Sequence, residues 1–284
     1  LRSDQLVGET ILETYTERID ELEQLVKARD FVTLPNRKMR IRLASEAESA
    51  AIPSPFMLPP RLIGNTGEMG EFVLPLRIPA EAGGESSQVP DYTFEAASWT
   101  LAVHEGRPGH ELQFSVMIES GVSLARSVFA FNYVNVEGWA LYCEAEMKPY
   151  LPLEGQLASL QQRLLRAARA FLDPGLQGGA ISEVEALRIL VGDVVLSPAL
   201  ARQEIDRYTF LDPAQATSYF CGYLRLMELR AELEQMMGGD FDARAFHDFV
   251  LRQGLLPPRL LRETTLAHFL GGGADRPAAT ETKN

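Results

Sequence analysis

The run His104-Glu105-Gly106-Arg107-Pro108-Gly109-His110 lies near the start of a long series of helical segments in this 284-residue chain. Proline has no N–H to donate to the helix at position 108, and its ring collides with the carbonyl group of residue 104. Gly106 and Gly109 allow backbone conformations that other residues avoid. We therefore predict that the helix bulges or breaks between Gly106 and Gly109.

This break decides whether the two histidines can act together. A His-Glu pair followed by a second His is typical of zinc hydrolases, in which two imidazoles bind the metal and the Glu accepts a proton from metal-bound water. Six residues are about 1.67 turns of an unbroken helix, so His104 and His110 would point to nearly opposite sides. A bulge would return His110 to the side of His104. The alternative is a helix end followed by a turn, with two histidines placed by chance.

Glu137 is the candidate third ligand. It begins a strongly apolar helical segment, where an unpaired carboxylate is expensive to bury. Its alternative role is an N-terminal helix carboxylate bound by free backbone N–H groups. We favour the ligand, because Glu137 and the two histidines complete one zinc site. Glu144 follows on nearly the same helix face, and it either orients a zinc-bound histidine through the second ring nitrogen or is a solvated helix residue.

A third cluster lies on a helix that we predict over residues 213–237. Gln215, Tyr219 and Tyr223 recur on one face of this helix and are candidates for contact with a substrate. A Tyr hydroxyl beside a metal could donate to the oxyanion of a tetrahedral intermediate, whereas the alternative is ordinary core packing. Arg225 could pair with a substrate carboxylate or form a surface salt bridge.

The periodicity of the chain predicts a mainly α fold, a multi-helix bundle with a small β-strand element near residues 38–80. We divide it into a long N-terminal helix (1–33), an irregular and β-containing segment (34–91), a helical catalytic domain (92–270) and a disordered tail (271–284). Within the helical part, we predict helices over 94–107, 109–119, 133–147, 155–172, 182–195, 198–208, 213–237, 243–252 and 258–269.

Charge and hydropathy exclude several partners. The net charge of −12 argues against a nucleic-acid surface or an anionic membrane as partner, since both favour clusters of Lys and Arg. No segment approaches the roughly 18 uninterrupted apolar residues of a membrane span. The chain starts at Leu1, so an export signal could have been removed; otherwise we favour a cytoplasmic location.

Four separated motifs together resemble the domain of unknown function 885 family, whose members are similar to zinc metallopeptidases. The resemblance covers residues 59–269, and the upstream region also looks similar. The motifs occur in the family's order: His104-Glu105-x-x-Pro108-Gly109-His110-x-x-Gln113, Glu137-Gly138-Trp139-Ala140-x-Tyr142-x-Glu144, Gln215-x-x-x-Tyr219-x-x-Gly222 and Phe246-His247-Asp248-x-x-Leu251-x-x-Gly254-x-Leu256-Pro257.

The resemblance implies a metallopeptidase-like helical bundle, distantly similar to the thimet oligopeptidases, with zinc in a deep cleft. The implied zinc ligands are His104, His110 and Glu137, and the implied general base is Glu105. Tyr219 and His247 are implied as transition-state donors across the cleft, although a single His on a helix is more often a structural hydrogen-bonding group.

Family members carry a further N-terminal helical portion. We therefore expect this chain to be the C-terminal catalytic half, whether as a fragment, a shortened variant or one part of a split protein. Apolar surface left by a missing N-terminal half could also drive formation of a homo-oligomer.

The leading hypothesis is a zinc-dependent hydrolase acting on a peptide or small amide substrate, with a metal-activated water and Glu105 as the base. The first alternative is a non-catalytic binding or scaffold module that retains the helical shell. The second is a zinc-dependent hydrolase of non-peptide amides or esters.

Overall fold

The computed structural model describes residues 1–3, 5–6, 9–52, 54–75, 77–78, 87–88 and 91–271. The disordered tail predicted over residues 271–284 lies almost entirely outside the described residues.

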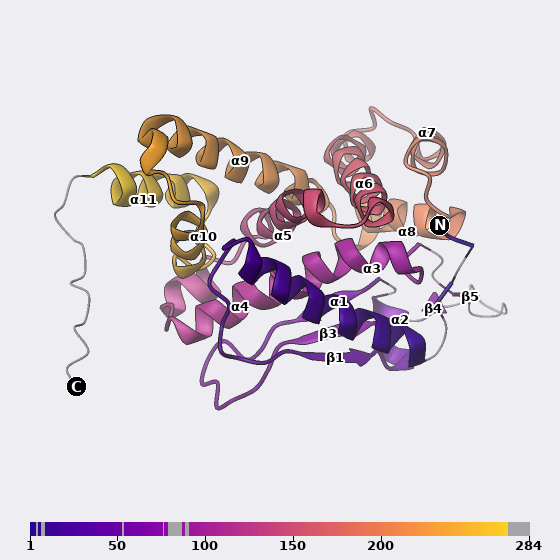
Figure 1. Ribbon diagram of the computed structural model, residues 1–284. Helices are drawn as coiled ribbons and strands as arrows, with labels where there is room; N and C mark the ends of the chain where they lie inside the picture. Colours follow the sequence, from indigo (N-terminus) through magenta and orange to yellow (C-terminus); the bar gives the residue numbers. More distant parts are fainter. Residues whose placement is uncertain are drawn as a thin grey trace.

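The described chain is mainly helical, which confirms the predicted fold class (Figure 1). A long first helix, α1 (Glu9–Ala28), precedes the strands. The remaining helices are α2 (Glu46–Ala51), α3 (Glu95–Leu101), α4 (His110–Glu119), α5 (Tyr133–Met147), α6 (Leu153–Gln177), α7 (Glu183–Arg188), α8 (Pro198–Asp206), α9 (Thr217–Met237), α10 (Ala243–Arg252) and α11 (Pro258–Leu270).

Short turns of other helix types join several of these helices. Wider, π-helical turns are η1 (Ala102–Gly106), η2 (Ala125–Phe129), η4 (Ile189–Asp193) and η5 (Arg207–Leu211), and tighter 3₁₀ turns are η3 (Lys148–Tyr150) and η6 (Gly238–Asp240). Single π-helical turns inside helical chains are frequent at functional sites. Both η1 and η5 carry residues of the candidate site.

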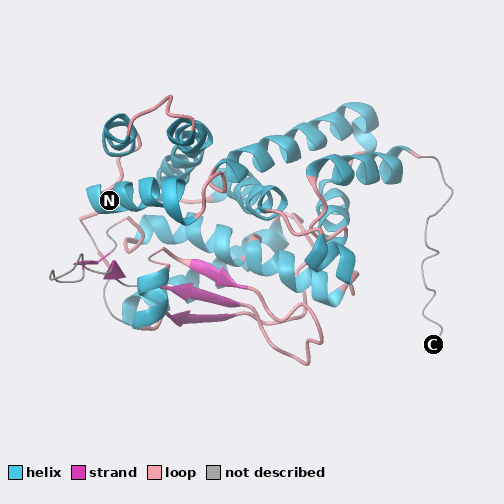
Figure 2. Ribbon diagram, turned by 180° about the vertical axis from the view of Figure 1, so that it is seen from behind, coloured by secondary structure: helices cyan, strands magenta, loops and turns pink. Residues whose placement is uncertain are grey.

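The predicted β element is a three-stranded sheet along one edge of the molecule (Figure 2). Its central strand, β3 (Glu71–Leu74), pairs in parallel with β1 (Arg40–Leu43) and antiparallel with β2 (Phe56–Leu58). Strand β3 ends at Leu74, directly before Pro75, which has no N–H to donate to a neighbouring strand. Beyond it, β4 (Arg77–Ile78) pairs with β5 (Ser87–Gln88).

Helix α2 was not predicted from the sequence. The segment predicted as irregular and β-containing over residues 34–91 has prolines at positions 53, 55, 59 and 60, which favour irregular structure. Ser45 and Glu48 nevertheless form a reciprocal capping box, in which each side chain bonds the backbone N–H of the other. This arrangement satisfies two otherwise unpaired donors at a helix start, and it stabilises a helix of one and a half turns before Pro53.

One hydrophobic core joins the sheet to the helices. It includes Tyr15 and Leu22 of α1, Phe72 of β3 and Trp139 of α5. The Tyr15 hydroxyl donates to the carbonyl oxygen of Tyr92 at 2.9 Å, so α1 is attached to the segment that leads into α3. Among the described residues, no helix combines the length and the apolar character that crossing a membrane requires.

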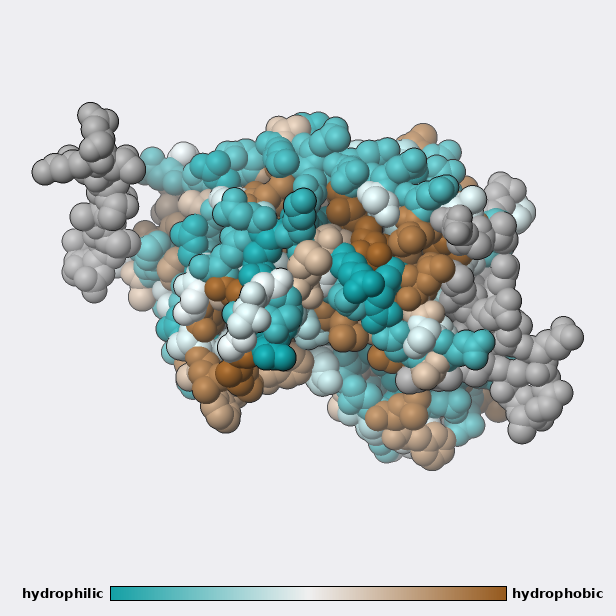
Figure 3. Space-filling model, turned by 90° about the horizontal axis from the view of Figure 1, so that it is seen from below, coloured by the Kyte–Doolittle hydropathy of each residue, from teal (hydrophilic) through white to brown (hydrophobic). Residues whose placement is uncertain are grey.

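Helix α6 buries polar and charged side chains together with apolar ones, and it exposes several large apolar side chains. Its buried face includes Gln162, Arg166, Arg169 and Asp173. Its exposed apolar residues recur at helical spacing: Leu153, Leu157, Leu160, Leu164 and Phe171. Hydrophobic patches also lie among hydrophilic residues on the face of the molecule shown in Figure 3.

Helices α5 and α9 touch backbone to backbone where they cross. A Cβ atom on Gly222 would lie 1.9 Å from the carbonyl oxygen of Val134, and one on Gly138 would lie 2.6 Å from the backbone of Gly222. No side chain fits between the helices at this point. Because Glu137 adjoins Gly138 and Tyr219 lies about one turn before Gly222, the crossing brings these two side chains into one site.

Substitution of Gly222 by Ala should therefore destabilise the fold. The new methyl group would meet rigid backbone atoms, so the helices must separate, at a cost of about 1–3 kcal/mol typical of overpacking. The free energy of unfolding in denaturant measures this loss. The matched control is Gly192→Ala, since a Cβ atom there would meet nothing within 4 Å. Equal stabilities of the two variants would contradict the proposed role of the crossing.

Candidate metal centre

The helix that carries His104 widens and then breaks, as the proline and glycines predict. The π-helical turn η1 follows α3 directly, and Arg107 is extended, with φ −119° and ψ 132°. Helix α4 then begins at His110. Gly109 is needed at the break, because a Cβ atom there would lie 2.0 Å from the carbonyl oxygen of His104.

Helix α5 holds this break in place. The indole Nε1 of Trp139 donates to the carbonyl oxygen of Pro108 at 3.0 Å. Arg107 is buried and its Nε donates to Glu111 at 2.6 Å. The break is thus a fixed part of the core, because the Pro108 carbonyl group and the Arg107 side chain both have partners on neighbouring elements.

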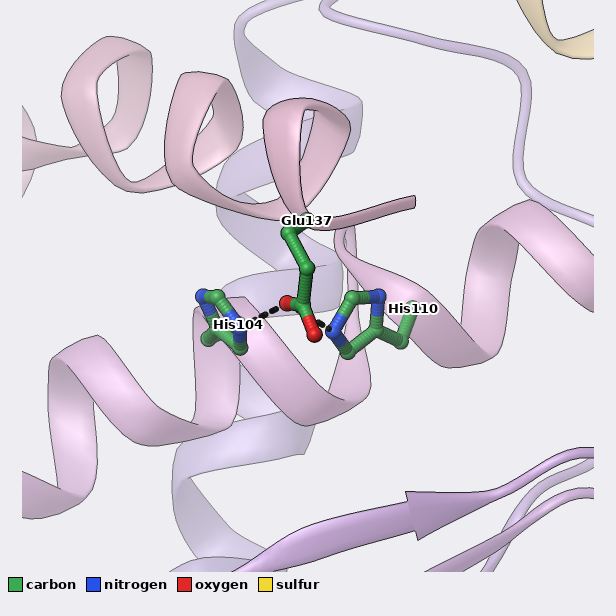
Figure 4. A group of neighbouring side chains, drawn as sticks. All are labelled: His104, His110 and Glu137. Atoms are coloured by element: carbon green, nitrogen blue, oxygen red, sulfur yellow. Dashed lines mark ion pairs between the residues drawn. The ribbon is translucent and has the colours of Figure 1, made fainter. Parts of the chain in front are cut away.

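His104, His110 and Glu137 converge on one point. Each offers a ligand atom, and these atoms all lie within 4.8 Å of one another. Glu137 Oε2 lies 3.4 Å from His104 Nε2 and 3.2 Å from His110 Nε2. Figure 4 shows the Glu137 carboxylate reaching from α5 to a position between the two rings.

The two separations from Glu137 Oε2 suit a shared cation. Ligand atoms arranged tetrahedrally at about 2.0–2.1 Å from zinc lie about 3.3 Å apart. All three side chains are buried, and Glu137 Oε2 has no hydrogen-bond partner among the described residues. A buried carboxylate oxygen without a hydrogen bond needs an explanation, and a metal ion held with the two imidazoles provides one. The donor set fits Zn²⁺.

Glu144 orients one of the two histidines. Its Oε1 lies 2.6 Å from His104 Nδ1, and its Oε2 accepts a hydrogen bond from Thr100 Oγ1 at 2.8 Å. Since Glu144 is buried, it is not the solvated helix residue of the alternative interpretation. A carboxylate on the far nitrogen fixes the tautomer that leaves Nε2 free to bind a metal. His110 Nδ1 has no corresponding partner within the described parts of the chain.

The electrostatics of the site favour positive charge. Burial by itself lowers the pKa of His104, but Glu137 and Glu144 outweigh it and raise this pKa to about 9. Burial raises the pKa of Glu137, yet the two imidazoles hold that pKa well below its usual value. The carboxylates therefore stay ionised, and the position between them stabilises a proton or a cation.

Glu105 also lies beside this centre. It lines the same cavity as the three candidate ligands. Burial raises the pKa of its carboxyl group, an effect that His104 and His110 reduce and Glu137 reinforces. A carboxylate with a raised pKa is a stronger base, as general-base catalysis near neutral pH requires.

The cavity has a volume of about 630 Å³, within the range of roughly 300–1,000 Å³ that small-molecule sites occupy. Its wall combines the candidate metal ligands with apolar side chains such as Phe131 and Tyr133, and with charged residues of α6, α8 and η5. It is large enough for a short peptide segment.

Tyr219 reaches the cavity as predicted. Its ring stacks on that of His104, with centroids 6.0 Å apart and planes 17° apart. Its hydroxyl accepts a hydrogen bond from Arg207 Nη2 at 3.2 Å. Burial raises the pKa of Tyr219, and Glu137 raises it further. The hydroxyl therefore keeps its proton and can donate it.

Gln215 also belongs to the site, because its side chain bonds the Glu137 carboxylate. Its Nε2 donates to Glu137 Oε1 at 3.3 Å. It lies in a turn, however, because α9 begins at Thr217 and not at the predicted residue 213. The Asp173 carboxylate accepts hydrogen bonds from the backbone N–H groups of Ala214 and Ala216. These bonds stabilise a turn where the sequence predicted the start of a helix.

Tyr223 and Arg225 lie outside the cavity. The ring of Tyr223 packs against Phe220. Arg225 is mostly exposed and pairs with Glu228 at 2.8 Å, which is the surface salt bridge of the alternative interpretation. Both residues follow Tyr219 at helical spacing, but the close α5–α9 crossing leaves only the Tyr219 end of the helix beside the metal centre.

His247 is a core residue. It is fully buried, its Nδ1 donates to the carbonyl oxygen of Phe31 at 2.6 Å, and its Nε2 accepts from the Tyr142 hydroxyl at 2.6 Å. The expected position across the cleft is therefore not found. Burial lowers the pKa of His247 to about 4, so it remains neutral.

Three arginines and a glutamate of the cavity wall were missed by the sequence interpretation: Arg166, Arg169, Arg207 and Glu204. The only available signal was the three-residue spacing of Arg166 and Arg169, which places them on one helix face. In a sequence with 27 Lys and Arg residues, such spacing does not separate a buried pair from a solvated one.

The chain matches, over residues 1–264, a family described as bacterial protein of unknown function (DUF885). No curated protein matches it. Among solved structures it is similar to a candidate lipoprotein of unknown function from Shewanella oneidensis, with 26% identity, a TM-score of 0.78, and coverage of 94% of this chain and 47% of that one. A candidate lipoprotein from Colwellia psychrerythraea has the same fold, with 23% identity, a TM-score of 0.79, and coverage of 94% and 45%. The chain thus spans less than half the length of either protein.

Burial of neutral His247 should make stability depend on pH. As the pH falls below about 6.5, the unfolded chain binds a proton at this residue before the folded chain does, so stability present above pH 6.5 is lost on the way to pH 4. Between pH 7 and 5 the loss from this group should be about 2 kcal/mol. Unfolding in denaturant at both pH values, for wild type and His247→Gln, isolates the contribution. Identical losses in the two proteins would contradict it.

Proposed function

We propose that this chain, which belongs to the DUF885 family of bacterial proteins, hydrolyses peptide or related amide bonds with the help of a zinc ion. The observation that carries the proposal is the convergence of His104, His110 and Glu137, with one buried carboxylate oxygen left without a hydrogen bond. The four motifs resemble the DUF885 family, and the likeness to zinc metallopeptidases that this resemblance implies is in line with the same reaction class.

His104, His110 and Glu137 would hold the ion. When bound, zinc lowers the pKa of a coordinated water to about 7 and polarises the carbonyl group of the substrate. Glu144 keeps His104 Nε2 facing the centre, and Gln215 restrains the Glu137 carboxylate through its Oε1.

Glu105 and Tyr219 are the reactive side chains of the chain itself. Glu105, with its raised pKa, accepts the proton of the attacking water and delivers it to the leaving nitrogen. Tyr219 donates its hydroxyl proton to the oxyanion that forms on the substrate carbonyl. Both side chains line the cavity wall, where the dielectric constant is lower than in bulk water and electrostatic interactions are stronger.

The first test is metal content. Protein purified without chelators should contain close to one zinc per chain, and His104→Ala and His110→Ala should lose most of it, because two protein ligands do not retain zinc as three do. Metal analysis of the purified proteins measures this. The control is His268→Ala, since His268 is exposed. Substoichiometric zinc in the wild type would contradict the proposal.

The second test separates metal binding from chemistry. Glu105→Gln should retain zinc but lose about 10²- to 10⁴-fold in kcat, the contribution typical of a general base. Hydrolysis of a panel of peptides, amides and esters measures the loss and identifies the preferred bond. Glu13→Gln is the matched control on the exposed side of α1. Undiminished activity of Glu105→Gln, with zinc present, would remove Glu105 from the mechanism.

A further inference from the structure

Three arginines surround Tyr219 in the wall of the cavity. The guanidinium carbons of Arg166, Arg169 and Arg207 lie 5.8, 4.8 and 5.6 Å from the centre of the Tyr219 ring. Arg166 and Arg169 come from α6 and Arg207 from η5. Three cations beside one ring create a positive region next to the candidate oxyanion donor.

The fold neutralises two of these arginines. Arg169 forms a two-point ion pair with Glu204, with contacts of 2.7 and 2.6 Å. Arg166 Nη2 lies 3.4 Å from Glu144 Oε1. Both arginines are buried. Such pairing is what a buried charge requires.

Arg207 differs because it has no carboxylate of its own. Its nearest carboxylate oxygen within the described residues is Glu204 Oε1, 4.0 Å from Nη1. Glu204 is already bound by Arg169 and by the Tyr208 hydroxyl, the latter at 2.7 Å. The cavity is also lined by Asp206 and Asp212, neither of which forms an ion pair with Arg207 in the described chain.

The free donors of Arg207 are accessible from the cavity. The side chain is 25% exposed, compared with 6% for Arg166 and Arg169. Its Nη2 bonds Gln215 Oε1 and the Tyr219 hydroxyl. Its Nε and Nη1 form no hydrogen bond within the described residues, so they can receive an anion of the substrate.

The position of Arg207 determines the distance between a bound substrate anion and the bond that is hydrolysed. Gln215 links the guanidinium to Glu137, since it accepts from Arg207 and donates to Glu137 Oε1. One side chain therefore separates the guanidinium from the candidate metal centre. In a peptide, the carboxylate of the last residue lies three bonds beyond the carbonyl carbon that is attacked, and each added residue extends the chain by about 3.3–3.6 Å.

We propose that Arg207 binds the free carboxylate of the substrate, so that the protein removes one or two residues from the carboxyl end of a short peptide. This inference rests on the proposed function and specifies its substrate class. Water adds to the carbonyl carbon, the C–N bond breaks, and the nitrogen leaves with the proton that Glu105 accepted from the water. The products are a shortened peptide acid and a free amino acid or dipeptide. Arg207 takes no part in proton transfer; it determines specificity.

Binding tests the inference independently of catalysis. Acetyl-Ala-Ala and acetyl-Ala-Phe, each as the free acid and as the C-terminal amide, are titrated calorimetrically into zinc-loaded Glu105→Gln protein. A hydrogen bond to a charged group contributes about 1.5–3 kcal/mol, so the acid should bind roughly 10- to 100-fold more tightly than the amide. In the double variant with Arg207→Gln, the two forms should bind equally, and Arg207→Lys should restore part of the preference.

Hydrolysis of the same peptides by wild-type protein gives the second readout. A role of Arg207 that only positions Tyr219 would lower kcat/KM for acid and amide alike, whereas the proposed role changes their ratio. Arg225→Gln, at an exposed arginine outside the cavity, should leave the ratio unchanged. Equal binding of acid and amide to protein that retains Arg207, or binding of neither, would overturn the inference. Carboxylate-dependent binding without hydrolysis of any substrate would instead overturn the proposed function and leave the Arg207 subsite standing.

Discussion

The contact between Gly138 and Gly222 determines the geometry of the whole site. Helices α5 and α9 cross there without intervening side chains, and a methyl group on either residue would overlap the backbone of the other helix. This close backbone contact fixes the positions along the two helices at which Glu137 and Tyr219 face each other. Helix α5 then brings two further functions to the same place, because Glu144 orients His104 and Trp139 donates a hydrogen bond to the carbonyl group of Pro108.

The buried charges follow from this arrangement. Glu105, Glu137 and Glu144 lie close together, and mutual repulsion would drive carboxylates apart or protonate them unless positive charge lies nearby. Two imidazoles and the arginines of α6 supply part of that charge. A divalent ion would supply the remainder at Glu137 Oε2, a buried oxygen that has no hydrogen bond within the described residues. The buried arginines of α6 would then balance negative charge alongside the ion held by the candidate ligands.

Much of the site could be predicted because its residues have strong local signals. Pro108 can adopt few backbone conformations, so the break in the helix could be predicted. Glu137 could be singled out because its carboxylate lies at the start of an apolar segment. The arginine wall had no such signal. Four leucines of α6, between residues 153 and 164, recur as on a core-facing surface, yet they are exposed. Arg166 and Arg169, which would ordinarily be assigned to solvent, are buried. His247 shows the same limit, since only the tertiary contacts to Phe31 and Tyr142 distinguish a core imidazole from a catalytic one.

The broken helix has a mechanical consequence. Where one unbroken helix carries both zinc-binding histidines, the helix already holds these two residues together. The ion then adds little to the connection between parts of the chain. Here His104 and His110 lie on opposite sides of a break, and Glu137 comes from a third segment. A cation bound by all three would close residues 104–137 into a ring, as a disulfide does, and would restrict the unfolded chain in the same way. The bound ion would thereby join the three segments on whose packing the candidate centre depends.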